Sequence, residues 1–323
     1  MRSERYAVVA LFIGLAAAAS LLDESALGVY VPWALAAIVT VGVSLLMGQA
    51  GQVSLGHGAF YACGAYAAGV LATHGWPSLL GLVVAPVAAA ALATLIGIPL
   101  LVLRGHHLAF ATLATHLICL SLLGEATITG GDVGLQGIPP LQVGPVEFHS
   151  VRMYAYLSSF ALLAVVIVAH NVLDSRPGRA LRALSTSELG AASSGVPVGG
   201  YKLAVLALSA AFAGAAGGIY AFYMGYLAPG SFPLILSVEY VVMAAIGGLG
   251  SISGAVLGSA AVVLLTHGLS RIATMSGMPD AAPIILSYAV YAALLIAAVI
   301  FLPGGIAAAM RTALQRILRR EAK

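Results

Sequence analysis

The chain has 323 residues, of which 61% are hydrophobic and only 8% are charged. Soluble domains carry about 25% charged residues, so this composition excludes a soluble fold, and the mean hydropathy of +1.04 indicates that lipid is the main solvent. The net charge of +3 is too small for a nucleic-acid surface, and no nucleic-acid partner is expected. Aromatic residues are few, and Ala, Leu, Val and Gly recur in long runs. We therefore predict an all-α, polytopic membrane protein.

Ten hydrophobic segments follow one another along a single transmembrane domain, residues 1–323. The first, Tyr6 to Leu22, is compatible with a signal peptide or with a retained span, and we favour the retained span. The other nine lie at about 29–47, 57–73, 78–103, 107–124, 153–173, 200–223, 235–248, 253–270 and 282–302. The segment 235–248 is short, which is compatible with a half-helix that breaks at the glycines after it.

The basic residues predict the orientation. With ten spans and a cytoplasmic N-terminus, both termini lie inside, and only Arg152 and Arg271 of the 14 Lys and Arg residues fall outside. This bias includes a basic cytoplasmic tail at 303–323. It predicts a multi-pass membrane protein with both termini in the cytoplasm.

Two polar loops should lie on opposite sides of the membrane. The outer loop, 125–150, is rich in Gly and Pro and acidic, which fits an extracytoplasmic docking or capping surface or a plain connector. The inner loop, 174–200, predicts a short amphipathic helix from Arg179 to Ser194, closed by Gly195 and Pro197. Its uneven apolar stripe comprises Leu181, Leu184, Leu189 and Ala192.

The sequence GQAGQVSLGHGAF, residues 48–60, places polar groups between two apolar segments. We interpret it as a broken helix that faces the interior, because irregular backbone at membrane depth must pack on protein or line a watery cavity. A tight cytoplasmic turn is the alternative. The similar string GGLGSISG, residues 247–254, hints at an internal duplication. The candidates for a solute pathway here are Gln49, Gln52, Ser54 and His57.

Small residues spaced by four predict close packing of helices. They are Gly214 with Gly218, and Gly250 with Gly254 and Gly258. The sequence does not reveal whether the partner helices belong to this chain or to a second subunit.

Ionisable groups inside the predicted spans are scarce. Glu239 is the one carboxylate there, and a pathway role and a structural role are equally open for it; for His116 we favour a structural role. This scarcity counts against a secondary carrier, since an ion-driven carrier usually has several such groups forming a relay. A secondary carrier or channel is kept as a remote alternative. Cys63 and Cys119 lie in apolar runs and do not indicate a disulfide or a metal site.

The enzyme motifs HExxH and GxSxG are absent from the chain, so no catalytic residue is expected. The P-loop pattern GK[ST] is absent as well, and the chain is not a Walker-type ATPase by itself. These absences count against an enzyme.

Several segments in order resemble one family. They are GQAGQVSLGHGAFYACGAYAAGVLA, RGHHLAFATLA, TGGDVGLQGIP, the stretch from GRALRALSTSELGAASSGVPVGG to YMGYLAPGSF, and GGLGSISGAVLG. Together they resemble the M-type permease subunits of bacterial branched-chain amino-acid (Liv-type) ABC importers. The resemblance covers most of the chain. It implies a transport permease subunit, not an enzyme, in the bacterial inner membrane, with the loop 125–150 on the periplasmic side.

This resemblance implies a set of partners: an H-type permease paralogue, two cytoplasmic ATP-binding subunits and a periplasmic solute-binding protein. ATP and Mg would be bound by those partners, with no cofactor in this chain. Branched-chain or other hydrophobic amino acids are the implied substrates, and urea, short amides and aromatic acids are the alternatives within the family.

The resemblance also implies that the inner loop couples the chain to the ATPase. The matching residues are Arg179, Arg182, Glu188, Ala191, Ala192 and Gly195. The arginines are compatible with acidic partners on the ATPase or with simple positive-inside anchoring. Ser-Thr-Ser at 185–187 replaces a more charged run before Glu188, a departure from the family pattern.

Overall fold

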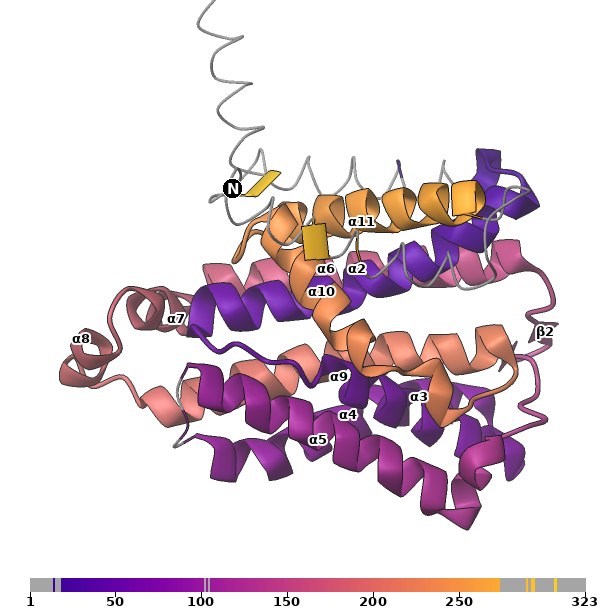
Figure 1. The fold of residues 1–323 in the computed structure, drawn as a ribbon, viewed down its shortest axis with the longest axis horizontal. Coiled ribbons are helices and arrows are strands. Elements are labelled where there is room, and N and C mark those ends of the chain that lie inside the picture. Colours follow the sequence, from indigo (N-terminus) through magenta and orange to yellow (C-terminus); the bar gives the residue numbers. More distant parts are fainter. Residues whose placement is uncertain are drawn as a thin grey trace, which may run out of the picture.

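The computed structural model describes residues 19–101, 103 and 105–273, with a few isolated positions elsewhere. The predicted last span at 282–302, the basic tail and most of the predicted first span lie outside these residues. The described part is almost entirely helical (Figure 1). Its α-helices are α2 (Glu24–Ala50), α3 (His57–Thr73), α4 (Ser78–Leu100), α5 (His106–Glu125), α6 (Val151–Asp174), α7 (Arg176–Thr186), α8 (Glu188–Ser193), α9 (Val198–Met224), α10 (Leu234–Gly247) and α11 (Ile252–Ala273).

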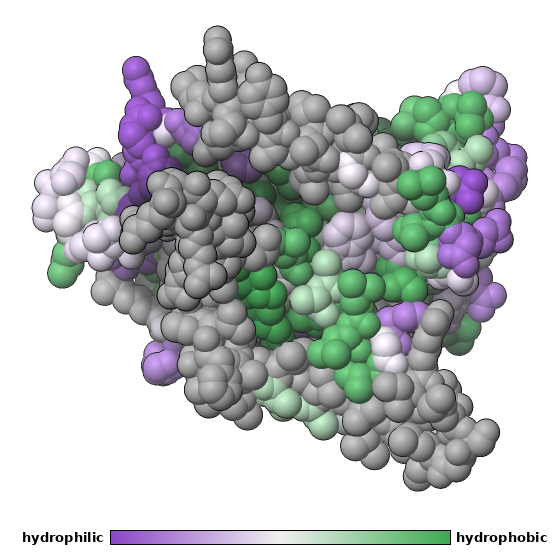
Figure 2. All heavy atoms as spheres, turned by 90° about the horizontal axis from the view of Figure 1, so that it is seen from above, coloured by the Kyte–Doolittle hydropathy of each residue, from purple (hydrophilic) through white to green (hydrophobic). Residues whose placement is uncertain are grey.

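Seven segments of the described chain are long and apolar enough to cross a membrane. The eight predicted spans that fall within the described residues all correspond to helices, and α3 has the predicted bounds. Hydrophilic residues gather at the two ends of the molecule, with hydrophobic residues between them (Figure 2). This distribution confirms the all-α polytopic membrane fold.

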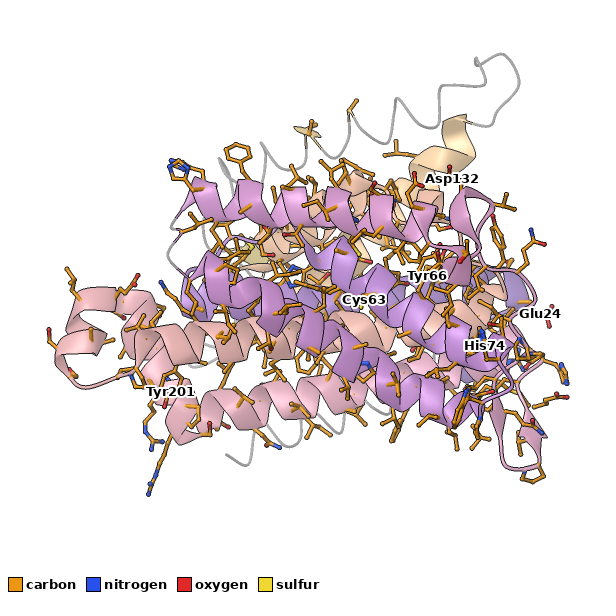
Figure 3. The ribbon with its side chains drawn as sticks, turned by 90° about the horizontal axis from the view of Figure 1, so that it is seen from below. Glu24, Cys63, Tyr66, His74, Asp132 and Tyr201 are labelled. Carbon is orange, nitrogen blue, oxygen red and sulfur yellow. The ribbon has the colours of Figure 1, made fainter. Side chains whose placement is uncertain are left out.

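The two ends of the helix bundle are built differently. At one end, α7 and α8 protrude beyond the long helices (Figure 1); we call this the α7 end. At the other lie the 3-10 turns η1 (Thr127–Thr129) and η2 (Gly131–Val133) and a hairpin of β1 (Gln142–Val143) and β2 (Val146–Glu147); we call this the hairpin end. In Figure 3, Tyr201 lies at the α7 end, Glu24, His74 and Asp132 lie toward the hairpin end, and Cys63 and Tyr66 lie between.

The centre of the bundle is α9, which packs against α2, α3 and α4. Small residues make this close approach feasible: a Cβ on Gly217 would overlap the backbone oxygen of Tyr61 in α3, and a Cβ on Gly218 would lie 2.7 Å from the Cβ of Ala85 in α4. A Cβ on Gly214 would lie 2.5 Å from the Cβ of Ala89 in α4, and a Cβ on Gly64 of α3 would overlap the backbone of Gly214. Gly214 and Gly218 therefore pack against helices of this same chain.

The second glycine series is only partly a helical face. Gly254 and Gly258 of α11 lie against the backbone of Gly247 and Met243 in α10. Gly250 differs from the prediction because it precedes α11: it has a φ of +80° in the turn between α10 and α11 and lies against Gly48 at the end of α2. A positive φ favours glycine at this position on conformational grounds.

Two helices, α3 and α10, begin near the middle of the bundle. The amide of Gly58, at the start of α3, donates to Ser237 Oγ in the first turn of α10 at 2.9 Å. Ser237 Oγ also bonds His116 Nδ1 at 3.1 Å, and His116 lies halfway along α5. Both helix starts are therefore at the mid-depth of α5, and α3 and α10 act as half-helices that run to opposite ends.

The inner loop forms two helices where the sequence predicts one. Ser187 adopts an extended conformation with φ −158° that ends α7, and its hydroxyl accepts from the amide of Gly190 at 3.1 Å, capping α8. A serine N-cap competes with helix continuation at this position. The prediction of a continuous helix from Arg179 to Ser194 is therefore wrong at Ser187.

The apolar stripe of this loop is divided accordingly. Leu181 and Leu184 of α7 are buried where α7 packs on α2, α6 and α9. Leu189 of α8 is 82% exposed and Ala192 is also exposed, so α8 presents apolar surface that the described chain does not cover.

Candidate functional site

A group of polar side chains lies where the half-helices meet. His57 Nε2 and Ser209 Oγ are 2.6 Å apart, and both residues are buried. His116 completes the group, with its Nε2 3.2 Å from the backbone oxygen of Phe232. We call Ser54, His57, His116, Ser209 and Ser237 the polar junction. Its members come from α3, α5, α9, α10 and the connector before α3, so movement of any one helix changes its geometry.

The connector between α2 and α3, residues 51–56, is irregular and partly buried. The amide of Leu55 donates to Thr112 Oγ1 of α5 at 2.9 Å, which satisfies one backbone group freed by the break. Gln52 and Ser54 are buried, and Gln52 Oε1 has no hydrogen-bond partner among the described residues. The break predicted from the sequence is thus present, and an amide oxygen remains there that a water molecule or a polar solute can bond.

The two glycine-containing motifs lie against each other. The amide of Gly250 donates to the backbone oxygen of Ser44 at 3.1 Å, and Gln49 Nε2 lies 3.5 Å from the oxygen of Gly250. The second glycine of each motif, Gly51 and Gly250, has a positive φ and follows the end of a helix. The sequence similarity therefore corresponds to a shared local structure, and Gln49 lies at this contact rather than in the polar junction.

Glu239 lines a separate cavity of about 220 Å³ between α2, α3, α9, α10 and α11. Tyr61, Tyr220 and Tyr240 also border it, and the ring centroids of Tyr61 and Tyr220 are 5.4 Å apart. The apolar part of the wall is made by Ala36, Leu236, Met243 and Val263. The structure thus separates Glu239 from the other predicted pathway residues and surrounds it with tyrosines.

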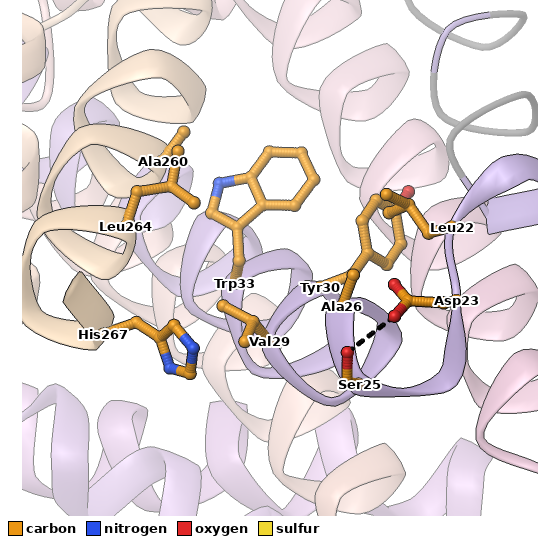
Figure 4. Close-up of a pocket in the computed structure, with 10 residues that line it drawn as sticks. All are labelled: Leu22, Asp23, Ser25, Ala26, Val29, Tyr30, Trp33, Ala260, Leu264 and His267. Atoms are coloured by element: carbon orange, nitrogen blue, oxygen red, sulfur yellow. Dashed lines mark hydrogen bonds between the residues drawn. The ribbon is translucent and has the colours of Figure 1, made fainter. Parts of the chain in front are cut away.

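A larger cavity, of about 550 Å³, lies between the start of α2 and α11 (Figure 4). Tyr30, Trp33 and Leu264 line it, and its polar edge is formed by Asp23, which accepts a hydrogen bond from Ser25 at 2.7 Å. It contains none of the residues that the sequence indicates for a pathway. We therefore centre the candidate site on the polar junction and on the cavity of Glu239.

Contacts with α6 and α9 of the same chain fix the position of α7 and α8. Lys202 Nζ, in the second turn of α9, lies 2.9 Å from Glu188 Oε2 at the start of α8. Arg182 Nη1 donates to the backbone oxygen of Leu173 at 2.8 Å, near the end of α6, whereas Arg179 is exposed. Gly195 closes α8 with a φ of +81°, and Ala191 is buried. These contacts attach α8 to α9 and α7 to α6.

Sequence reasoning missed several of these residues. Ser209, Ser237, Tyr61 and Tyr220 become neighbours of the predicted residues only through tertiary contacts, whereas Tyr240 directly follows Glu239 in the sequence. Lys202 did carry a signal: it is one of two lysines in the chain, at the edge of an apolar segment and 14 positions after an acidic residue. Among the residues that the structure describes, no group of three or more His, Cys, Asp or Glu side chains is placed to hold a metal ion.

A bundle of apolar helices that contains two half-helices and a buried polar junction defines an integral membrane protein with the features of a transport protein. Comparison with known families gives the same class. A family model described as the permease component of branched-chain amino acid transport systems matches residues 25–299, and the chain belongs to this family. No solved structure matches the chain.

Two curated relatives are similar over most of the chain. The high-affinity branched-chain amino acid transport system permease protein LivM of Escherichia coli (strain K12) is 31% identical over 259 residues. The protein of the same name from Salmonella typhimurium is 32% identical over 259 residues. Each match covers 72% of this chain and 61% of the relative, so the chain matches less than two thirds of the length of these relatives.

Proposed function

We propose that the chain is a permease subunit of a binding-protein-dependent ABC importer and forms part of the pathway for branched-chain or other hydrophobic amino acids. The observation that carries this proposal is the family match over residues 25–299. The two relatives are permeases of branched-chain amino acid transport, which favours this solute over urea or short amides.

Energy would reach this subunit through α8. This short helix protrudes from the α7 end (Figure 1), and Leu189 offers 82% of its surface to a partner. A cytoplasmic ATP-binding subunit that holds Leu189 in a groove would pull on α8 when its nucleotide dimer closes. Since Glu188 is paired with Lys202, that pull passes directly to α9.

The helix α9 would carry the movement to mid-depth. Ser209 of α9 bonds His57 at the start of α3, so a shift of α9 changes the junction of the half-helices. This route supports alternating access, in which nucleotide-driven movement opens the pathway first to one side and then to the other. The α7 end would then face the cytoplasm of the bacterial inner membrane, and the hairpin end would face a periplasmic solute-binding protein.

The assembly implied by this proposal has an H-type permease beside this chain and two ATP-binding subunits that bind ATP and Mg. In that assembly Arg179, Ala192 and Gly195 would lie at the ATPase contact with Leu189. Arg182 and Ala191 would instead shape the segment from within, because one bonds Leu173 and the other is buried.

The test is co-purification followed by uptake. The chain should co-purify with an ATP-binding partner and, in liposomes with its binding protein, should support ATP-driven leucine uptake. Leu189→Gln should greatly reduce both co-purification and uptake, because it removes the apolar side chain that the ATPase groove would hold. The fold of the chain itself should be unaffected, since Leu189 is exposed. Ile128→Gln, an exposed apolar residue at the hairpin end, is the matched control for co-purification. Equal recovery of the ATPase with Leu189→Gln would contradict the coupling role of α8.

A further inference from the structure

The cavity of Glu239 combines a carboxylate with aromatic rings. Leu236, Glu239, Tyr240 and Met243 follow at spacings of three and four along α10 and so share one face of the helix. Across the cavity, the ring centroid of Tyr61 lies 6.3 Å from that of Tyr240. Three helices therefore bring one carboxylate and three tyrosine rings to the wall of one small space.

The position of the cavity fits a solute that arrives from the hairpin end. Tyr61 is in the second turn of α3, which runs from mid-depth toward that end, and Tyr220 is in the last turns of α9. Ser231, in the 3-10 turn that precedes α10, also lines the cavity. The first turns of α10 contribute Leu236 and Glu239, so the cavity lies between the hairpin end and the polar junction.

The size of the cavity limits the ligand. Its volume of about 220 Å³ is below the ~300–1,000 Å³ of pockets for drug-sized ligands, so the space suits a small solute. An apolar portion of such a solute would face Ala36, Leu236, Met243 and Val263.

The chemistry of the wall favours a positive charge beside that apolar portion. A carboxylate on the wall attracts a cation, and charge-assisted hydrogen bonds are stronger than neutral ones. Tyrosine rings attract a cation to their faces as well. A primary ammonium group on a short aliphatic chain matches the carboxylate, the rings and the apolar wall together.

We propose that this cavity binds a small apolar amino acid on its way through the membrane domain, with its ammonium group donating to Glu239 and its side chain against α2, α10 and α11. The inference rests on the proposed function for the class of solute and assigns the site within the chain. Glu239 is a binding residue in this account, and the tyrosines define the space around the ammonium group.

Labelling of the cavity wall tests the site directly. Ser231→Cys is introduced into the assembly purified in nanodiscs, with Cys63 and Cys119 replaced by Ala, and its rate of maleimide labelling is measured. Leucine and isoamylamine, which lacks the carboxylate, should slow the labelling. 4-Methylpentanoate, which lacks the ammonium group, should not. Glu239→Gln should raise the half-protecting leucine concentration about ten- to a hundred-fold, the factor for a hydrogen bond to a charged group.

Glu125→Gln, the same substitution at an exposed carboxylate near the hairpin end, is the matched control and should leave protection unchanged. Glu239→Asp, which keeps the carboxylate, should retain more of the leucine protection than Glu239→Gln. If Glu239→Gln does not fold, Glu239→Asp is compared with the parent protein instead. Protection by 4-methylpentanoate equal to that by leucine, or equal protection in both Glu239 variants and the control, would overturn the inference.

Uptake measured on the same preparation separates the two proposals. ATP-driven leucine uptake without leucine protection of Ser231→Cys would reject the cavity as the site and leave the proposed function standing. Protection in a preparation that neither retains an ATPase nor transports leucine would support the site and reject the importer assignment.

Discussion

At the scale of single residues, the ion pair between Lys202 and Glu188 is the side-chain contact that joins α8 to α9. The side chain of Lys202 is 11% exposed and that of Glu188 is 37% exposed, with Nζ and Oε2 2.9 Å apart. Removing one partner of a fully buried pair costs about 3–5 kcal/mol. Solvent at Glu188 screens this pair, so we expect a contribution closer to that of a surface pair.

A double-mutant cycle measures that contribution. Lys202→Met keeps the apolar stem of the side chain, and Glu188→Gln keeps the shape of the carboxylate. Each change should lower the unfolding temperature, and the interaction energy between them should be about 1 kcal/mol because only the pair is shared. Thermal unfolding of the two single variants and the double variant in detergent provides the values. Strictly additive effects would show that the two groups do not interact in solution.

At the scale of elements, the packing of α9 depends on the absence of side chains at particular positions. A Cβ on Gly217 would overlap the backbone of α3, whereas a Cβ on Gly200, in the first turn of the same helix, would meet nothing within 4 Å. The same substitution, Gly→Ala, should therefore affect the stability of the protein differently at these two positions.

Gly217→Ala should destabilise the protein by about 1–3 kcal/mol, the usual cost of inserting a methyl group into a packed interior. Gly200→Ala should leave the stability unchanged or raise it by up to about 1 kcal/mol, since alanine has the higher helix propensity. The unfolding temperatures of the two variants, compared with the parent protein under one condition, check the difference. If Gly217→Ala were as stable as Gly200→Ala, α9 and α3 would not be in the close contact described.

At the scale of the whole molecule, the two ends of the bundle must lie on opposite sides of a membrane. Single cysteines at Ser193 of α8 and at His149 beyond the hairpin, in a background without Cys63 and Cys119, report on the two ends. A membrane-impermeant maleimide should label the position at His149 in intact spheroplasts and the position at Ser193 only in inverted vesicles. Labelling of both positions from one side would contradict the orientation that the basic residues predict.

Much of this architecture could be predicted from the distribution of apolar residues. The helix α3 begins and ends where its apolar run is bounded by polar residues and glycines, and α10 ends at the glycines that suggested a half-helix. The break at Ser187 could not be predicted, because serine is compatible with both a helix interior and an N-cap until the tertiary position of α8 is fixed.

The composition of the candidate site was less accessible to sequence reasoning. Glu239 could be singled out as a carboxylate within an apolar segment, but its tyrosine neighbours come from residues 61 and 220, far away along the chain. The hydrogen bond between His57 and Ser209 joins positions 152 residues apart. These residues come together because α9 packs against α3. In the sequence, that packing is visible only as small residues at scattered positions, which do not reveal the partner helix.

The start of α3 and α10 at mid-depth has an energetic consequence for permeation. A rise of about 1.5 Å per residue makes α10 about 21 Å long, short of the ~30 Å hydrocarbon thickness of a bilayer. In the proposed importer, the point where two such short helices meet is where the barrier between the two aqueous phases would be shortest. A tilt of modest amplitude would then switch which compartment hydrates the solute, so the proposed importer would need little mechanical work per transported molecule.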